Sequence, residues 1–327
     1  MTTEPHTGTM ISIVAPVHDE QDSLPDLARR VAECADGLAG LEWELILVDD
    51  GSRDSSYAVM LGLAAHDSRI KVAQLSRNFG HQIALSAGIE LARGDAVVMM
   101  DSDLQHPPEL IGRFVELWRE GYDVVYGVMR DRPEGWFKRF TANAHYALLN
   151  HLTKREMPAG AGDFRLIDRT VVDAFVAMRE RDRYVRGMFA WLGFTQIGVD
   201  YVPAPRLAGQ SKYTVRKMTH LAFDGIFSFS VFPLRLVLGL GLVVSAISFL
   251  FGIGSAISKL VGVYTVPGWA TIVVVTTFIG GVQLIVLGGI GEYLGRVYDE
   301  VKQRPLYVVR SLHNFDEPGR AEQERRS

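Results

Sequence analysis

The segment Ala96-Val-Val-Met-Met-Asp-Ser-Asp-Leu-Gln-His-Pro-Pro108 passes directly from an uncharged apolar run to two carboxylates. Ala96 to Met100 predicts a short buried strand, and Asp101-Ser102-Asp103 begins the loop that follows it. Leu45 to Val48 runs in the same way into Asp49-Asp50-Gly51-Ser52. Apolar runs that end in polar turns are typical of parallel strands whose carboxyl ends face a ligand.

The same alternation extends over the first 120 residues. Further apolar runs lie at Ile11–Ala15 and Ile70–Leu75. Helix-like segments separate the runs, at 23–38, 55–65, 82–92 and 108–120. Strands that alternate with amphipathic helices predict an α/β fold, with a mostly parallel sheet covered on both faces. Ligands then bind beyond the carboxyl ends of the strands, which is where this chain places its acidic pairs.

Charge and cysteine content exclude several classes of protein. The 34 Lys and Arg residues face 38 Asp and Glu residues, so the net charge of -4 argues against a basic nucleic-acid binder. A single cysteine, Cys34, excludes an internal disulfide framework and a cysteine-cluster metal site. No Gly-x-Gly-x-x-Gly follows an early strand, and no Walker-type loop is present. Hydride transfer and P-loop phosphoryl transfer therefore lose support.

Charge is almost missing from one part of the chain. Between Leu236 and Gly291 the single charged residue is Lys259, and the runs 236–258 and 269–291 are uncharged. A helix of 23 residues is about 35 Å long, enough to cross a hydrocarbon core of about 30 Å. The pattern favours a transmembrane hairpin, and the alternative is a pair of buried core helices.

The positive charges near the two runs predict an orientation, with both termini and the α/β domain on the cytoplasmic side of the inner membrane. These flanking charges are Lys212, Arg216, Lys217 and Arg235 before the first run and Arg296, Lys302, Arg304 and Arg310 after the second. The expected divisions are a flexible N-terminus (1–10), a catalytic domain (11–222), a juxtamembrane interfacial segment (223–235), the hairpin (236–295) and a cytoplasmic tail (296–327). The charge-rich end, 311–327, is expected to be disordered.

The acidic pairs indicate a metal and a diphosphate. Hard cations such as Mg²⁺ and Mn²⁺ take oxygen ligands and often bind through one or two carboxylates plus substrate phosphates. Asp101 and Asp103, with Gln105 just beyond, have this chemistry, although Asp-x-Asp and Asp-Gly also occur in plain turns. His81, His106, His145 and His151 have no metal-ligand spacing, and helix-surface or capping roles are expected for them.

Six motifs in order resemble glycosyltransferase family 2, and more narrowly its polyisoprenyl-phosphate glycosyltransferases, which include dolichol-phosphate mannose synthases and bacterial undecaprenyl-phosphate glucosyltransferases. They are Val14-Ala-Pro-Val-His-Asp-Glu20, Leu47-Val-Asp-Asp-Gly-Ser-Arg-Asp54, Ser76-Arg-Asn-Phe-Gly80, Met100-Asp-Ser-Asp-Leu-Gln-His-Pro-Pro108, Gly162-Asp-Phe-Arg-Leu166 and Arg206-Leu-Ala-Gly-Gln-Ser-Lys-Tyr213. The resemblance covers about 12–310 and implies a GT-A fold. It also implies transfer of a hexose from a nucleotide sugar to a polyprenyl phosphate at the membrane, with UDP-glucose favoured over GDP-mannose and UDP-N-acetylglucosamine.

Matching the motifs assigns roles to positions of this chain. The resemblance implies that Pro16, Val17, Glu20, Asp49, Asp50 and Ser102 hold the nucleotide sugar, that Asp101, Asp103 and Gln105 hold Mg²⁺ or Mn²⁺ and the donor diphosphate, and that Arg206, Ser211 and Lys212 close over the phosphates. The chain departs from the usual pattern at His18-Asp19, where Tyr-Asn is common, and at Met129, where an Arg commonly follows Gly-Val.

The acceptor in such a reaction is a phosphate monoester, already anionic near neutral pH, so it needs no strong base. Direct attack would invert the anomeric configuration. We expect Asp163 to position a partner or tune charge rather than remove a proton. A basic cluster before and within the amphipathic segment 136–149 suits a lipid phosphate or, alternatively, a solvated helix face: Arg130, Arg132, Lys138 and Arg139.

Two other functions remain open at this point. A processive polysaccharide synthase needs a translocation channel, for which two spans per chain are few. A catalytically silent membrane scaffold or flippase subunit has no need of the acidic motifs. Glycines in the second run permit a homo-oligomer, either a dimer or a tetramer.

Overall fold

The computed structural model describes residues 5–129, 161–181, 183–203, separate positions between 239 and 261, and 268–315. The chain divides into two compact units, one formed by Met1–Tyr213 with Pro305–Ser327 and the other by Thr214–Arg304. Much of the first expected span (236–258), all of the segment 223–235 and the ends 1–4 and 316–327 lie outside the described residues.

The described part of the first unit contains an eight-stranded sheet in the order β7-β5-β6-β4-β1-β2-β3-β8. β4, β1, β2 and β3 are mutually parallel, while β6 and β8 run antiparallel to their neighbours. The expected mostly parallel α/β sheet is therefore confirmed. The strands are β1 (Met10–Val17), β2 (Glu42–Asp49), β3 (Ile70–Leu75), β4 (Ala96–Met99), β5 (Val124–Met129), β6 (Ala161–Asp168), β7 (Gln196–Tyr201) and β8 (Val309–His313).

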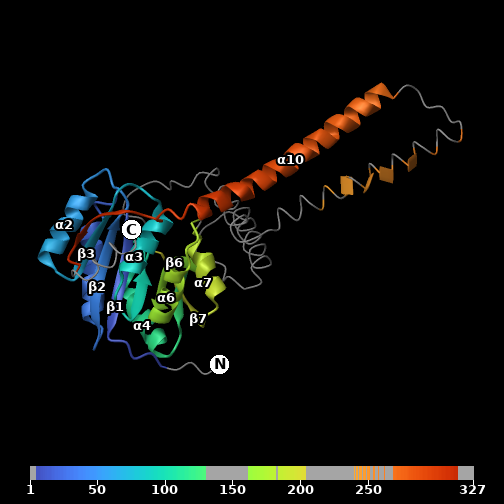
Figure 1. Cartoon of the computed structure of the whole chain (residues 1–327). Coiled ribbons are helices and arrows are strands. Elements are labelled where there is room, and N and C mark those ends of the chain that lie inside the picture. Colours follow the sequence, from blue (N-terminus) through green and yellow to red (C-terminus); the bar gives the residue numbers. More distant parts are fainter. Residues whose placement is uncertain are drawn as a thin grey trace. The chain divides into compact units, whose positions relative to one another are not determined.

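Helices cover both faces of this sheet (Figure 1). One layer contains α1 (Leu24–Asp36), α2 (Ser56–His66) and α4 (Ile111–Arg119), and the other contains α3 (His81–Leu91), α6 (Arg169–Ala177) and α7 (Val185–Leu192). The short helix η1 (Pro108–Leu110) packs against α1. β1 and β2 are buried along almost their whole length, as expected for strands covered on both faces.

The helix α3 lies unusually close to the sheet because it has a glycine at the contact. A Cβ at Gly88 would lie 2.2 Å from Cγ1 of Val14 and 3.1 Å from Cγ2 of Val48. In the first turn of the same helix, His81 contacts Asp101 after β4 and Gln82 contacts Asp163 on β6.

The antiparallel strand β6 brings a distant segment to the same edge. β4 and β6 pair with Val97 opposite Ile167 and Met99 opposite Arg165. The same register continued by two residues sets Asp163 opposite Asp101. A residue separated from Asp101 by about sixty positions therefore faces it across the sheet.

The described residues after Pro305 return to the sheet instead of forming a tail. β8 pairs antiparallel with β3, with Ala73 opposite Leu312. The hydroxyl of Tyr57 lies 2.9 Å from Oγ of Ser311 and 3.0 Å from Nε2 of His313. The interpretation of 311–327 as a disordered tail is therefore wrong for residues 311–315. Edge pairing is made by backbone groups, so it does not require the apolar run by which the other strands were predicted.

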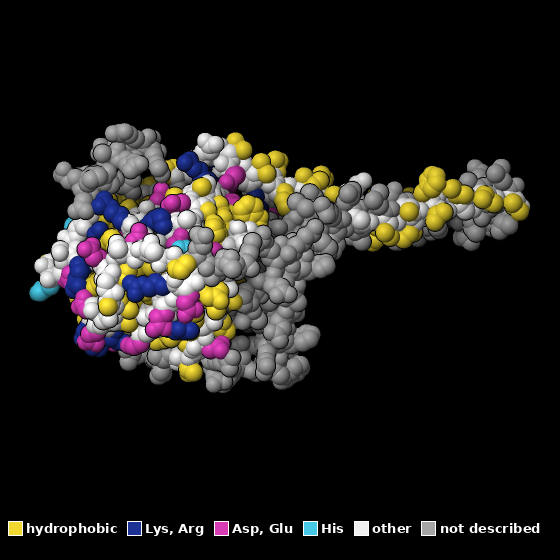
Figure 2. Space-filling view, turned by 90° about the horizontal axis from the view of Figure 1, so that it is seen from below, with side chains coloured by type: hydrophobic (Ala, Val, Ile, Leu, Met, Phe, Trp, Pro, Cys, Tyr) yellow, Lys and Arg dark blue, Asp and Glu magenta, His cyan; other side chains and the backbone are white. Residues whose placement is uncertain are grey.

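The described part of the second unit is dominated by α10 (Trp269–Val301), which contains the second expected span and continues ten residues beyond it. By length and composition, Phe278–Val301 is apolar enough to cross a membrane, with a mean hydropathy of 1.4 and no residue buried in its most apolar window. Figure 2 shows mixed acidic and basic side chains over the sheet unit and mainly hydrophobic ones along the described part of the helical unit.

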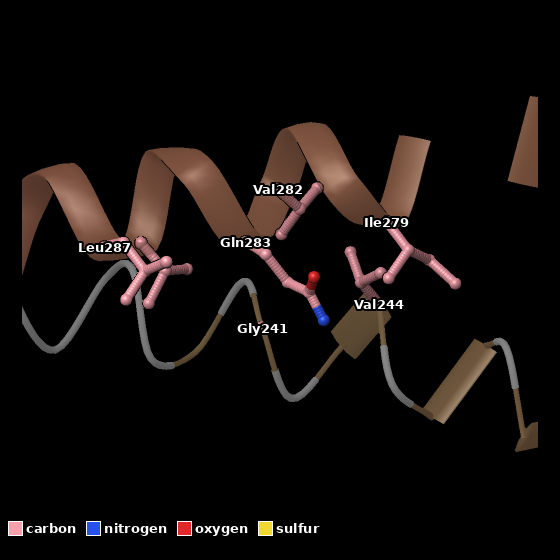
Figure 3. Close-up of a pocket in the computed structure, with 7 residues that line it drawn as sticks. Gly241, Val244, Ile279, Val282, Gln283 and Leu287 are labelled. Atoms are coloured by element: carbon pink, nitrogen blue, oxygen red, sulfur yellow. The ribbon is translucent and has the colours of Figure 1, made fainter. Parts of the chain in front are cut away.

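An open cavity lies within the second unit, between α10 and the described positions before it. Ile279, Val282 and Leu287 line it together with Val244 and Gly241. Gln283 is its one amide side chain, and it points across the cavity toward the chain at Gly241 (Figure 3).

Candidate functional site

The carboxyl ends of three parallel strands are tied together by hydrogen bonds. The Ser102 hydroxyl, just after β4, donates to the Pro16 carbonyl at 2.9 Å. The Asp50 amide, just after β2, donates to the Val17 carbonyl at 2.9 Å. The loops that carry the acidic motifs therefore share one edge of the sheet.

Asp49 and Asp50 are buried and hold neighbouring loops in place. The Asp49 carboxylate accepts hydrogen bonds from the Ser52 amide at 3.0 Å and from the Gln74 side chain at 3.3 Å. Asp50 accepts from the amides of Phe79 and Gly80 at 2.7 and 2.9 Å. Burial raises the pKa of the Asp50 carboxyl although these amide bonds oppose the rise. Both side chains therefore fix the loops after β2 and β3.

The loop after β1 is held against the start of α2. The Glu20 amide donates to Oγ of Ser56 at 2.9 Å, and Asp19 accepts from the Arg53 amide at 2.7 Å. Asp19 has a left-handed φ of 57°, a conformation in which Asp and Asn are enriched because a short polar side chain bonds locally.

Asp101 lies between two histidines. Its carboxylate is 2.9 Å from Nε2 of His81, at the start of α3. Its backbone amide donates to Nδ1 of the buried His106 at 2.9 Å, and Nε2 of the same ring lies 3.6 Å from the Asp101 carboxylate. Burial would raise the pKa of the Asp101 carboxyl, but His106 and His81 together lower it below its usual range. The expectation of a helix-surface or capping role is wrong for His106, which is buried in the loop after β4. His81 is the first residue of α3 and its side chain is 46% exposed, and it also contacts Asp101.

The residues expected to hold a divalent cation have side chains of the kind that bind one. Asp103 lies two residues from Asp101, and its carboxylate accepts from the Gln105 amide at 3.1 Å. Leu104 between them has a left-handed φ of 62°, which makes the turn tight. The described residues contain no group of three His, Cys, Asp or Glu side chains suited to a metal. Two carboxylates with one amide oxygen suit Mg²⁺ or Mn²⁺ that takes its other ligands from a substrate diphosphate and water.

Asp163 forms an ion pair with Arg186. Nε and Nη2 of Arg186, in the first turn of α7, donate to its two oxygens at 2.6 and 2.9 Å. The Gln82 side chain donates to the same carboxylate at 3.4 Å and accepts from the Val185 amide at 3.2 Å. Gln82 thereby links α3, β6 and α7.

The structure therefore brings together the expected residues that it describes. The expected residues that lie outside the described part of the chain are Arg130, Arg132, Lys138, Arg139, Arg206, Ser211 and Lys212. The residues that the sequence did not identify as part of the site are His81, Gln82, His106 and Arg186. No spacing marks them in the sequence, because they meet the acidic residues through folding alone.

Comparison with known proteins agrees with this architecture. The sequence profile of Glycosyl transferase family 2 matches residues 12–175. An uncharacterized glycosyltransferase of Synechocystis is 46% identical over 307 residues, which cover 94% of this chain and 96% of that protein. A bactoprenol glucosyl transferase of Shigella phage SfII is 40% identical over 304 residues, 93% of this chain and 98% of the relative.

A solved structure of glucosyl-3-phosphoglycerate synthase from Mycobacterium tuberculosis has a looser likeness, with a TM-score of 0.46 and 19% identity over 68% of this chain and 78% of that one. The sequence relatives, in contrast, extend over nearly the full length of both proteins. The chain belongs to glycosyltransferase family 2, in the group that contains the bactoprenol glucosyl transferases.

Proposed function

We propose that the protein transfers a hexose from a nucleotide sugar to a polyprenyl phosphate, with UDP-glucose as donor and undecaprenyl phosphate as acceptor. The observation that carries this proposal is the 40% identity, over nearly the whole chain, to proteins named bactoprenol glucosyl transferase. The acidic loops gathered at one edge of the sheet support it, because they offer a site for a nucleoside diphosphate and its cation.

The chemistry needs orientation and charge stabilisation more than proton removal. An oxygen of the acceptor phosphate attacks the anomeric carbon, and the bond from that carbon to the donor diphosphate breaks. The electron pair leaves with the diphosphate, and the configuration at the sugar is inverted. Asp49 and Asp50 hold the loops that would surround the nucleotide. Asp101, Asp103 and Gln105 would bind the cation. A bound Mg²⁺ or Mn²⁺ supplies charge stabilisation to the departing diphosphate. Arg206, Ser211 and Lys212 are proposed to close over the donor phosphates, and Arg130, Arg132, Lys138 and Arg139 to attract the lipid phosphate.

The proposed location is the cytoplasmic membrane, with two spans and with both termini and the sheet unit in the cytoplasm. Phe278–Val301 supports one span by its length and composition. A lipid acceptor also requires that the site lie at a membrane surface. A dimer or tetramer formed through the glycine-containing spans remains part of the proposal.

A transfer assay with a panel of donors tests the proposal. Membranes that contain the full-length protein are incubated with undecaprenyl phosphate, Mg²⁺ and labelled UDP-glucose, GDP-mannose or UDP-N-acetylglucosamine. We expect a lipid-linked monosaccharide from UDP-glucose and none after chelation of divalent cations. Asp103→Asn should lower kcat by at least about a hundredfold, since it removes one charged cation ligand.

Other outcomes point to other functions. A polymeric product would identify a processive synthase. Absence of both product and cation-dependent nucleotide-sugar binding would identify a scaffold or flippase subunit. Full activity of Asp103→Asn would contradict the assignment of the cation ligands.

A further inference from the structure

The site contains an arginine whose role the acidic motifs do not explain. Arg186 is the second residue of α7, and its guanidinium forms a two-point contact with Asp163 on β6. Asp163 is only 8% exposed at its side chain, whereas the side chain of Arg186 is 37% exposed. The pair therefore has a buried anionic half and a more exposed cationic half.

Asp163 is poorly suited to accept a proton. Its two oxygens already accept from Arg186, and Gln82 donates to one of them. The buried Arg165 contributes a second nearby positive charge. Burial would raise the pKa of the Asp163 carboxyl, but Arg186 and Arg165 hold it well below its usual range. A carboxylate that remains ionised at every physiological pH is an anchor for cations rather than a base.

Anchoring has a consequence for Arg186. A guanidinium is planar, with five N–H donors in a rigid arrangement, and Asp163 contacts its Nε and Nη2 edge. Contact along one edge fixes the plane and direction of the whole group. An arginine oriented in this way is suited to bind a phosphate, because little side-chain entropy remains to be lost.

Arg186 lies beside the expected donor site rather than on its cation ligands, because its partner Asp163 is on β6, near Asp101 and His81. The donor is expected at Asp101 and Asp103, in the loop after β4, whereas Arg186 lies beside β6. Gln82 lies between the two, near His81 on one side and Asp163 on the other. An anionic acceptor that approaches three carboxylates needs a cation nearby, and Arg186 is a partly exposed one among the described residues.

We propose that Arg186 binds the phosphate of the acceptor and that Asp163 serves to hold Arg186 in place. This inference rests on the proposed function, since it concerns the acceptor of that reaction. The proposal adds a second phosphate ligand to the basic cluster expected at 130–139. That cluster precedes the motif with Asp163 in the sequence, and Arg186 follows it.

Steady-state kinetics of the full-length enzyme test this assignment. Initial rates are measured against undecaprenyl phosphate at saturating UDP-glucose, and against UDP-glucose at saturating acceptor. Arg186→Gln should raise KM for undecaprenyl phosphate by about tenfold or more, the usual effect of one lost charge-assisted hydrogen bond. KM for UDP-glucose and the affinity for UDP should stay within about twofold of wild type. Arg186→Lys should be intermediate, because it keeps the charge without the planar geometry.

Two further variants sharpen the result. Arg179→Gln removes an exposed arginine seven residues away and should leave all constants unchanged. Asp163→Asn should raise KM for the acceptor with a modest loss of kcat. A fall in kcat of more than about a thousandfold with unchanged acceptor KM would instead make Asp163 a proton acceptor and overturn the proposal.

The outcomes separate the two hypotheses. Equal increases in both KM values would place Arg186 on the donor diphosphate, and no change in either would remove it from binding; both results overturn the inference. If Arg186→Gln fails to bind UDP, the two KM values are measured for Arg186→Lys instead. A rise in the KM for undecaprenyl phosphate without a matching rise in the KM for UDP-glucose then supports the proposal. A wild-type enzyme that makes no lipid-linked sugar refutes the proposed function itself.

Discussion

Left-handed backbone conformations occur in the loops that follow β1, β2 and β4 at the site edge of the sheet. Asp19 follows β1 with a φ of 57°, Gly51 follows β2 with 68°, and Leu104 follows β4 with 62°. For Asp19 and Leu104 this conformation costs about 1–2 kcal/mol each. Such conformations persist where surrounding contacts enforce them. Here these contacts are the bonds of Asp19 and Asp50 to neighbouring loops and the bond from the Gln105 backbone amide to Asp103 within its own loop. Local strain therefore lies where the substrate is expected.

Substitution of Gly51 by alanine should damage the nucleotide pocket specifically. A Cβ there would lie 2.6 Å from the amide nitrogen of Asn78, against backbone that cannot easily move, and the positive φ adds strain. Displacement of this loop would break the bonds from Phe79 and Gly80 to Asp50. We expect a loss of about 2–4 kcal/mol in unfolding free energy and a raised KM for UDP-glucose. Thermal unfolding and kinetics measure both.

Gly40→Ala is the matched control, because Gly40 also has a positive φ, 73°, but no atom lies within 4 Å of its would-be Cβ. It should lose about 1 kcal/mol and keep its kinetic constants. Equal effects of the two variants would show that backbone strain alone, and no contact with the 77–80 loop, governs Gly51.

Among the elements, α6 illustrates how a polar residue fixes a helix to the sheet. Asp168 ends β6 and caps α6, and its carboxylate accepts from the Thr170 amide at 2.8 Å and from Nε1 of the buried Trp118 at 2.9 Å. Burial would raise the pKa of this carboxyl, but the bonds from Thr170 and Trp118 lower it below its usual range. One carboxylate thus joins β6, α6 and α4.

Asp168→Ala should lose about 2–4 kcal/mol of unfolding free energy near neutral pH, from the missing cap and the unpaired indole N–H of Trp118. Because the folded-state pKa is lowered, the charged carboxylate stabilises the fold above the ordinary Asp pKa of about 4, and this contribution is lost as the pH falls below it. The difference in stability between wild type and variant should therefore shrink between about pH 5 and pH 3. Denaturant unfolding at several pH values measures it, with the exposed Asp173→Ala as control. A constant difference would exclude the ionised carboxylate as the cause.

The strand β8 should protect the edge of the sheet. A chain that ends at Arg304 loses β8 and exposes the backbone groups of β3, which favours aggregation. A chain that ends at Phe315 keeps β8 and the bonds from Asn314 to the carbonyls of Ala64 and Ile70. We expect the first truncation to lower the thermal midpoint by roughly 5 °C or more and the second to leave it unchanged. Similar midpoints for both would show that β8 adds no stability.

The helices and strands of the first 120 residues were largely predictable, because each is a local pattern. The runs at 11–15, 45–48, 70–75 and 96–100 became β1 to β4, each within a few residues of its expected ends. β8 was missed because an edge strand with one covered face needs few apolar residues. His81 and Arg186 were missed because their partners are distant in the sequence.

For the whole molecule, the distribution of charge makes a prediction about membrane topology. The loop at 259–268 carries one positive charge, while positive residues cluster on the other side of both expected spans. In a Cys34→Ser background, Val261→Cys should react with a membrane-impermeant maleimide in intact cells. Ser68→Cys, exposed on the sheet unit, should react only after the membrane is opened. Labelling of Ser68→Cys in intact cells would reverse the orientation, and labelling of neither would place residue 261 within the membrane.

The sequence alone predicted the mostly parallel sheet, the acidic loops and the apolar runs. Each of these features is a pattern among neighbouring residues, such as a short apolar run that ends in a polar turn. The folded chain decided which residues meet at the edge of that sheet. Antiparallel β6 sets Asp163 opposite Asp101, α3 and α7 bring Gln82 and Arg186 to it, and β8 closes the far edge. Contacts of this kind depend on strand order and register. These are set by the free energy of the whole folded chain, so no local pattern in the sequence reveals them.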